Sequence, residues 1–91
     1  MQDFRNIVAW QRAHELTLAV YQHTRSFPNE ERFAMQSQMR RAASSAPANI
    51  AEGSSRRSDR DFLRFLEIAA GSLKELQYFI ILATDLGYFS N

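Results

Sequence analysis

The sequence contains no cysteine, few glycines and prolines, and no long apolar run. Without cysteine, neither a disulfide framework nor a thiolate metal site can stabilise the fold, and this is compatible with a reducing cytoplasm. The longest uninterrupted apolar run, residues 78–83, is far too short to span a bilayer. The first four residues lack the basic-then-apolar order of a signal peptide. We therefore expect a cytoplasmic protein that does not enter a membrane.

An excess of one charge is missing as well. Eleven basic and ten acidic side chains give a formal net charge of +1, so no global field draws the protein toward nucleic acid or a membrane. Any basic site must be local. A chain of 91 residues makes a single domain, residues 1–91, which buries only about 60–65% of its unfolded surface. Because such a core is thin, association with other chains would add stability.

The scarce glycines and prolines divide the chain into three helical segments. The first covers about residues 6–27 and stops there because the residue before a proline is pushed out of the helical region. The second covers about residues 30–53, and Asn29 is placed to cap its start. The third and longest covers about residues 58–86. The sequence therefore predicts an all-α fold.

The second segment is rich in alanine, which lets a neighbouring helix come close. Its bulk is predicted to come from Phe33, Met35, Met39 and Ile50.

Pro47 lies inside this segment and is predicted to bend the helix without breaking it. Proline has no backbone N–H, so the carbonyl of Ala43 loses its usual helical donor. The groups that could replace the donor are Ser44, Ser45, Asn49 or a neighbouring chain.

The third segment carries the clearest helix signals. Ser58 and Asp61 resemble a capping box, and Gly87 stands where a left-handed C-terminal cap belongs. Apolar residues in alternating steps of four and three form two adjacent seams. One seam can pack within the chain, and the other favours self-association unless the first two helices wrap both. The candidate interface residues of the second seam are Phe65, Ile68, Phe79, Leu82 and Leu86.

The titratable residues do not form a catalytic or metal-binding pattern. His14 and His23 fall on opposite sides of the first helix and cannot share a metal ion. Glu67 and Glu75 are two turns apart, too far for a paired acid and base unless another chain intervenes. Gly53 begins a turn and not a phosphate-binding loop. We therefore expect no enzyme, no catalytic residue, no metal and no cofactor.

A local excess of arginine is the one asymmetry of charge. Residues 40–64 hold six arginines and three acids. Pairs at i,i+4 and i,i+3 spacing, namely Glu52–Arg56, Arg57–Asp61 and Arg64–Glu67, favour salt bridges. A stripe of guanidinium groups can also follow a phosphate backbone. Both uses stay open for the candidate nucleic-acid-binding residues, which are Arg40, Arg41, Arg56, Arg57, Arg60 and Arg64.

Several longer motifs follow one another along the chain. They are Phe4 to Gln11, Phe27-Pro28, Gln38 to Ala43, Asn49 to Gly53 and Phe62 to Leu76. Together these motifs resemble the bacterial four-helix bundle family that is encoded in intervening sequences of some large-subunit ribosomal RNA genes. The resemblance implies an antiparallel up-down bundle that assembles into a homopentameric ring, with no established enzymatic activity.

The resemblance also implies partners. Relatives include the accessory protein of diversity-generating retroelements, a pentameric basic barrel that binds nucleic acid and a reverse transcriptase. Family members usually continue past Tyr88 into a fourth helix, whereas this chain stops at Asn91. We therefore expect a homo-oligomeric, non-enzymatic accessory factor that associates with RNA or DNA. The alternative is a protein-interaction scaffold that binds no nucleic acid.

Overall fold

The computed structural model describes residues 3–89, and all regular secondary structure in that range is helical. The long helices are α1 (Val8–His23), α2 (Met35–Ser54) and α3 (Asp59–Asp85). The short 3-10 turns are η1 (Phe4–Asn6), η2 (Thr24–Ser26) and η3 (Asn29–Glu31). The prediction of an all-α protein with three main helices is confirmed for the described part of the chain.

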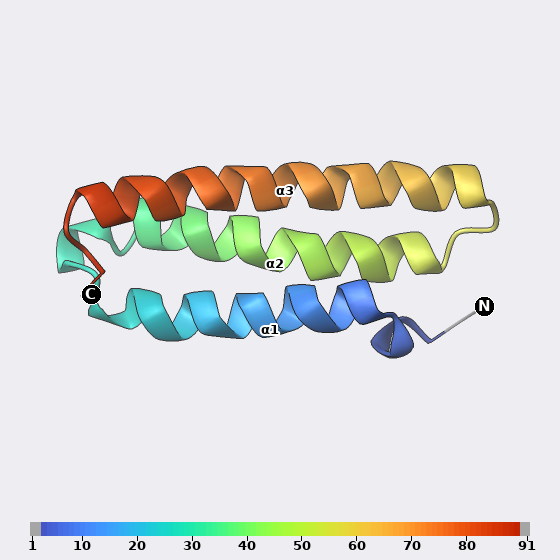
Figure 1. Cartoon of the computed structure of the whole chain (residues 1–91), viewed down its shortest axis with the longest axis horizontal. Coiled ribbons are helices and arrows are strands. Elements are labelled where there is room, and N and C mark those ends of the chain that lie inside the picture. Colours follow the sequence, from blue (N-terminus) through green and yellow to red (C-terminus); the bar gives the residue numbers. More distant parts are fainter. Residues whose placement is uncertain (1–2, 90–91) are drawn as a thin grey trace.

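The three helices lie side by side along the long axis of the molecule (Figure 1). The chain reverses direction between α1 and α2 and again between α2 and α3. Helix α2 lies between the other two and packs against both. The molecule measures 44 × 21 × 19 Å, so its length is close to that of α3. Among residues 3–89, no helix is both long and apolar enough to cross a bilayer.

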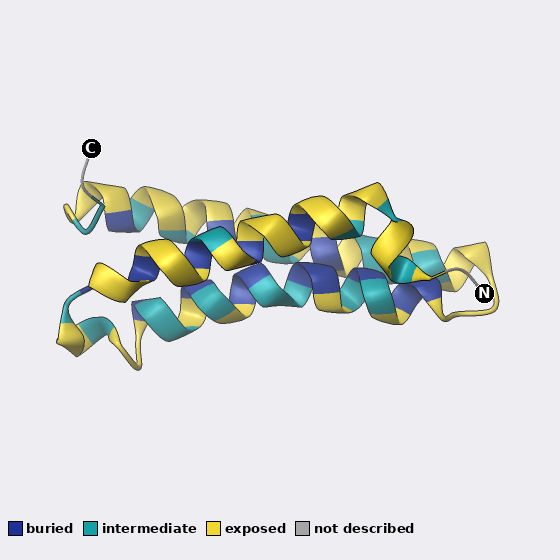
Figure 2. Cartoon of the chain, turned by 90° about the horizontal axis from the view of Figure 1, so that it is seen from below, coloured by how far each residue is buried: buried dark blue, intermediate teal, exposed yellow. Residues whose placement is uncertain are grey.

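The core runs the length of the molecule as two clusters of buried side chains, and Figure 2 shows buried residues recurring along each helix. On α3, Ala69, Leu76 and Ala83 are buried at intervals of seven residues. On α2, the alanines at the contact surface include Ala43 and Ala46, which are almost fully buried. Small side chains on both helices allow the backbones to approach closely, as the alanine content predicts.

At Gly53, α2 and α3 approach each other closely. A Cβ atom at this position would lie 2.7 Å from the Cβ of Phe65 and 2.9 Å from the Cδ1 of Phe62. Both distances are shorter than van der Waals contact, so a side chain here would push α3 away from α2. The sequence places this glycine near the end of the second helix but does not reveal that a helix crosses it.

Helix α2 starts five residues later than the predicted start at Glu30. Asn29 opens the η3 turn instead, and the backbone of Ala34 (φ −117°, ψ −103°) is not helical. The carboxylate of Glu31 accepts a hydrogen bond from the N–H of Met35 at 3.3 Å, so it satisfies one of the free donors of α2. Glu31, and not Asn29, therefore caps the start of α2.

Phe33 was predicted to add bulk to the core, and this prediction is wrong. Its side chain is 88% exposed, whereas Met35, Met39 and Ile50 are buried as expected. The reason is local, because Phe33 lies in the turn before α2 and the start of the helix shifts it off the buried face.

Pro47 lies in a continuous helix, so α2 is not broken there. The carbonyl of Ala43 receives its donor from α1, where the hydroxyl of Thr17 lies 3.0 Å away. None of the predicted neighbours supplies that bond. Asn49 instead donates to the carbonyl of Ser45 at 2.8 Å. Helix α1 therefore compensates for the defect that proline creates in α2.

Both ends of α3 follow the prediction. The hydroxyl of Ser58 accepts a hydrogen bond from the N–H of Asp61 at 3.1 Å. Gly87 adopts a φ of 79°, and Tyr88 donates its N–H to the carbonyl of Ala83 at 2.9 Å. This pattern is a Schellman motif, which requires the left-handed conformation that glycine adopts without strain.

The second apolar seam of α3 does not form a separate outer face. Phe79 and Leu82 are half-buried and pack against the core cluster shared with α2, and Phe65 lies next to Gly53 of α2. Only Ile68 and Leu86 of this seam are exposed, at about half of their surface. Both seams lie beside the contact between α3 and α2, because α3 packs against α2 along its length.

Candidate nucleic-acid interface

Arg40 holds α1 and α2 together. Its guanidinium group donates hydrogen bonds to the hydroxyl of Thr24 at 3.0 Å and to the carbonyl of Tyr21 at 3.2 Å. It also lies 4.6 Å from the centroid of the Tyr21 ring, within cation–π range. Because Tyr21 and Thr24 lie at the C-terminal end of α1, the positive charge stabilises the negative end of the helix dipole. This arginine is therefore a structural contact, although the sequence left it without a partner.

Arg56 and Arg64 meet at the ring of Phe65. Their guanidinium carbons lie 4.6 Å and 5.3 Å from the ring centroid. Arg56 also forms the predicted ion pair with Glu52, at 3.0 Å. Arg56 precedes α3, so it does not continue a helical stripe from Arg64. The turn between α2 and α3 brings the two arginines together instead.

Arg41, Arg57 and Arg60 form no ion pair within residues 3–89. The predicted pair between Arg57 and Asp61 is absent from this range, and so is the pair between Arg64 and Glu67. Arg57 and Arg60 are exposed at the end of the molecule where α2 passes into α3. Asp59 and Asp61 lie in the first turn of α3, where carboxylates stabilise the positive end of the helix dipole.

A second group of arginines lies toward the opposite end of α2, and of its members only Arg25 and Arg32 were not singled out from the sequence. Arg32, Arg40 and Arg41 line one open groove together with Tyr21 and Phe33, with a volume of about 290 Å³. Arg25 and Arg32 line a smaller groove beside it. Tyr21 of α1 is 19 residues from Arg40 of α2, so the turn between α1 and α2 brings them together in this groove. The signal that could have found them is the four arginines against two glutamates in residues 21–41.

A polar groove runs between α2 and α3, with a volume of about 510 Å³. The hydroxyl of Ser72 on α3 donates to the hydroxyl of Ser45 on α2 at 2.8 Å and so joins the two helices. Arg41 and Glu75 line the same groove without forming an ion pair. Its remaining lining residues are Phe33, Ser37, Gln38 and Ala42.

An apolar groove of about 150 Å³ separates α1 from α3. Leu16 and Ala19 of α1 form one side, and Ile80 of α3 forms the other. Met39 of α2 and Phe89 also line it. Leu16 and Ile80 are each more than a third exposed. The groove is therefore an exposed apolar surface between α1 and α3, both of which pack against α2.

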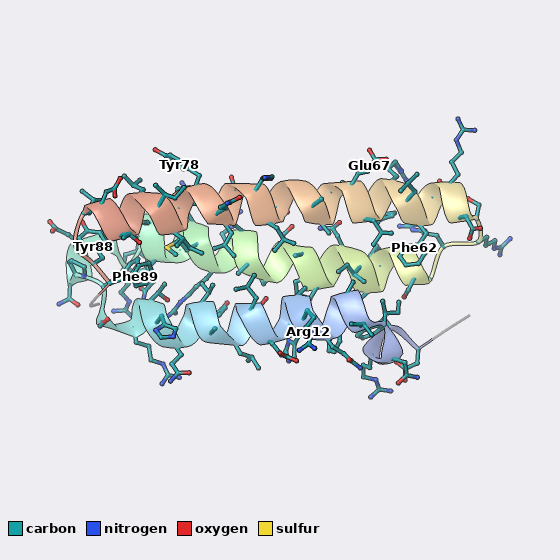
Figure 3. The ribbon with its side chains drawn as sticks, in the orientation of Figure 1. Arg12, Phe62, Glu67, Tyr78, Tyr88 and Phe89 are labelled. Atoms are coloured by element: carbon teal, nitrogen blue, oxygen red, sulfur yellow. The ribbon has the colours of Figure 1, made fainter. Side chains whose placement is uncertain are left out.

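The C-terminal segment closes the end of the molecule where α1 passes into α2. Figure 3 shows Tyr88 and Phe89 at this end, with Phe62 at the other. The hydroxyl of Tyr88 donates a hydrogen bond to the carboxylate of Glu31 at 2.7 Å. This bond, followed by burial and the charges of Glu31 and Glu30, raises the pKa of Tyr88 above its ordinary value of 10.0. The rings of Tyr88 and Phe89 also pack against Phe27.

The histidines do not meet. His14 stacks on the ring of Trp10 with centroids 4.9 Å apart, and His23 borders the apolar groove. Figure 3 shows Glu67 pointing away from the other helices. Within the described range, no three metal-ligating side chains of the His, Cys, Asp or Glu type come together.

These features define a class, a small all-α protein with three main helices in the described range and arginine-rich surfaces at both ends of its central helix. The chain belongs to the 23S rRNA-intervening sequence protein family, whose model matches residues 5–91. This confirms the family indicated by the motifs. A comparison with curated proteins found no match.

Proposed function

We propose that this chain is the subunit of a homo-oligomeric, non-enzymatic helical bundle that associates with RNA or DNA as an accessory factor. In this proposal the bundle is antiparallel, and copies of it close into a ring. The contact with nucleic acid is made by the arginines around the α2–α3 turn. Membership in a family described by a ribosomal RNA intervening sequence supports the nucleic-acid part of the proposal.

The observation that carries the proposal is the state of Arg57 and Arg60. Both are exposed, and neither forms an ion pair within the described residues. Arg56 and Arg64 lie close by, on the ring of Phe65. Residues 56–64 hold four arginines and two aspartates, so an external anion is favoured by this local excess of positive charge. Guanidinium groups bind phosphate oxygens with paired hydrogen bonds, which favours a phosphate backbone as that anion.

Self-association is supported by the groove between α1 and α3. Its lining exposes Leu16 and Ile80 to water. Exposed apolar side chains that line a groove are typical of an interaction surface. A helix from a second copy would bury it and complete a four-helix arrangement around α2.

A titration of structured RNA tests the nucleic-acid contact. We expect the purified protein to bind with an affinity that falls steeply as salt rises, because phosphate contacts release counterions. Changing Arg57 and Arg60 together to Ala should weaken binding and reduce the salt slope by about one for each lost phosphate contact. The matched control changes Arg5 and Arg12 to Ala, which removes the same charge from arginines that pair with Asp3 and Glu15.

Two outcomes would contradict this proposal. If the wild-type protein binds RNA with an affinity that does not change with salt, the arginines do not contact phosphates. An Arg57/Arg60 variant that binds normally but changes its mass in light scattering shows that these arginines serve subunit contacts. The second outcome would favour the alternative function, a protein-interaction scaffold that binds no nucleic acid.

A further inference from the structure

Phe33 is exposed in a setting that the core does not explain. It is 88% exposed, and the guanidinium carbon of Arg32 lies 5.4 Å from its ring centroid. A single exposed apolar residue needs no explanation by itself. The surroundings of Phe33 make this one different, because grooves open on both sides of it.

Phe33, Ser37 and Arg41 form a ridge between two grooves, since all three line the groove toward α1 and also the groove toward α3. Successive members are four residues apart, so Ser37 and Arg41 lie one above the other on α2 and Phe33 stands just before the helix. The ridge therefore presents an aromatic ring, a hydroxyl and a guanidinium group in a row.

The two grooves beside the ridge differ in chemistry. The groove toward α1 is lined by Arg32, Arg40 and Arg41, and no acidic residue lines it. The groove toward α3 contains the carboxylate of Glu75 and the amide of Gln38. An anion is therefore favoured on the first side. A group with N–H donors is favoured on the second, because a carboxylate only accepts hydrogen bonds.

We propose that the ridge binds an unpaired nucleotide of a single-stranded nucleic acid. The base stacks on Phe33 and turns its donor edge toward Glu75, while the adjoining phosphate lies against Arg32 and Arg41. A nucleotide has the three groups that these surfaces favour, namely a flat ring, N–H donors on one edge and a negative charge. This inference rests on the proposed association with nucleic acid but places a second contact at the opposite end of α2 from Arg57 and Arg60.

The test compares variants of Phe33 in binding to a short fluorescent single-stranded RNA. Phe33→Leu keeps an apolar side chain but removes the ring, and we expect it to weaken binding roughly 5- to 150-fold, the range of one stacked base. Phe33→Tyr keeps the ring and should bind like the wild type. Tyr78→Leu is the matched control, because Tyr78 is another exposed aromatic residue, 58% exposed on α3, and lines neither groove.

A spectroscopic readout separates stacking from a general effect on the fold. The variant Phe33→Trp should retain binding, and the fluorescence of its added indole should be quenched as the RNA saturates the protein. Helix content measured by circular dichroism should stay unchanged in all variants, since Phe33 supports no buried contact. Arg41→Ala should weaken binding and lower its salt dependence, because it removes a phosphate contact.

The possible failures differ from those of the proposed function. If the Phe33→Leu variant binds the single strand as tightly as wild type while the Arg57/Arg60 variant loses structured RNA, the ridge is not a nucleotide site and the proposed function stands. If only the Phe33 and Arg41 variants lose binding, the ridge is supported and the contact at Arg57 and Arg60 is overturned. A wild-type protein that binds neither RNA overturns both. A Phe33→Leu variant that changes the subunit number makes Phe33 a subunit contact and overturns the inference.

Discussion

The hydroxyl oxygen of Thr17 on α1 lies 3.0 Å from the carbonyl oxygen of Ala43 on α2, the carbonyl that Pro47 deprives of its helical donor. The same hydroxyl lies 2.8 Å from the carbonyl of Ala13 on its own helix, so one proton serves two acceptors. Thr17 and Ala43 are both buried, and water cannot replace the bond. A defect in one helix is therefore linked to a side chain of the next.

Changing Thr17 to Val tests this link, because valine keeps the shape of threonine and removes its hydroxyl. We expect the free energy of unfolding to fall by about 1–3 kcal/mol, the cost of leaving a buried carbonyl without a donor. Denaturant unfolding measures the change. Thr84→Val is the matched control, since the hydroxyl of Thr84 bonds only within the exposed face of α3, and it should change stability by less than about 0.5 kcal/mol.

A double-mutant cycle with Pro47→Ala isolates the cause. Alanine restores the N–H that α2 needs to satisfy Ala43, so Thr17→Val should cost less in the Pro47→Ala background than in the wild type. Equal costs in the two backgrounds would show that the hydroxyl serves Ala13 and not the proline defect.

The main lines of the fold could be predicted because they depend on local chemistry. Ser58 and Gly87 mark the ends of α3 through capping rules that need only neighbouring residues. Apolar periodicity likewise predicts a seam on α3, and Ala69, Leu76 and Ala83 are its buried residues. These signals are repeated along the chain and agree with one another, and such agreement makes a helix prediction dependable.

The features that the sequence does not reveal depend on contacts between distant segments. Arg40 is 16 residues from Thr24, and Glu31 is 57 residues from Tyr88, so no spacing rule connects them. The arginines of the candidate site divide in the same way, into local pairs that spacing predicts and contacts between segments that it does not. The ion pair between Glu52 and Arg56 formed at helical spacing, but the position of Tyr21 of α1 beside Arg40 and Arg41 required the folded chain.

Gly53 allows a second prediction, because α3 passes directly over it. Gly53→Ala would place its Cβ 2.7 Å from the Cβ of Phe65, and the helices would have to separate. We expect a loss of about 1–3 kcal/mol in unfolding free energy, although alanine is the better helix former. Gly71→Ala is the control, since nothing lies within 4 Å of the added atom. That variant should gain about 0.5–1 kcal/mol, and a loss in both variants would point to a cause other than the crossing.

Replacing Arg40 should lower the stability of the fold, whereas replacing Arg57 or Arg60 should not. Arg40→Ala removes two hydrogen bonds to the end of α1, and we expect it to lower the free energy of unfolding by about 1–3 kcal/mol. Arg57→Ala and Arg60→Ala should each change stability by less than about 0.5 kcal/mol. Thermal and denaturant unfolding of the three variants measure this difference. Equal stability of all three would mean that Arg40 is not the tie between α1 and α2.

The hydrogen bond from Tyr88 to Glu31 predicts a dependence of stability on alkaline pH. Because the pKa of Tyr88 in the folded chain lies above its ordinary value of 10.0, the stability that this bond contributes is fully present below pH 10. It is lost as the pH rises through the raised pKa and the phenol ionises beside a carboxylate. In Tyr88→Phe this part of the alkaline loss should disappear, whereas Tyr78→Phe should keep it. Unfolding measured between neutral pH and pH 11 distinguishes the two, with a wild-type curve that matches Tyr88→Phe counting against the bond.

The last prediction concerns the apolar surfaces of α1 and α3. If a helix of another copy occupies the groove between them, Leu16→Lys should reduce the subunit number, because it places a charge on an apolar wall that is 38% exposed. Leu18→Lys on the same helix is the control, since Leu18 does not line the groove. Light scattering after size exclusion measures the mass, and circular dichroism checks that the helices remain.

Phe79→Ala should lower the stability of the subunit and not its assembly, because Phe79 packs against the core of its own chain. It should destabilise the subunit by about 3–5 kcal/mol at most, with assembly lost only as the helices unfold. Dissociation by Phe79→Ala with the helices intact, together with a Leu16→Lys variant that keeps its full mass, would move the contact between copies from the groove to the second seam of α3.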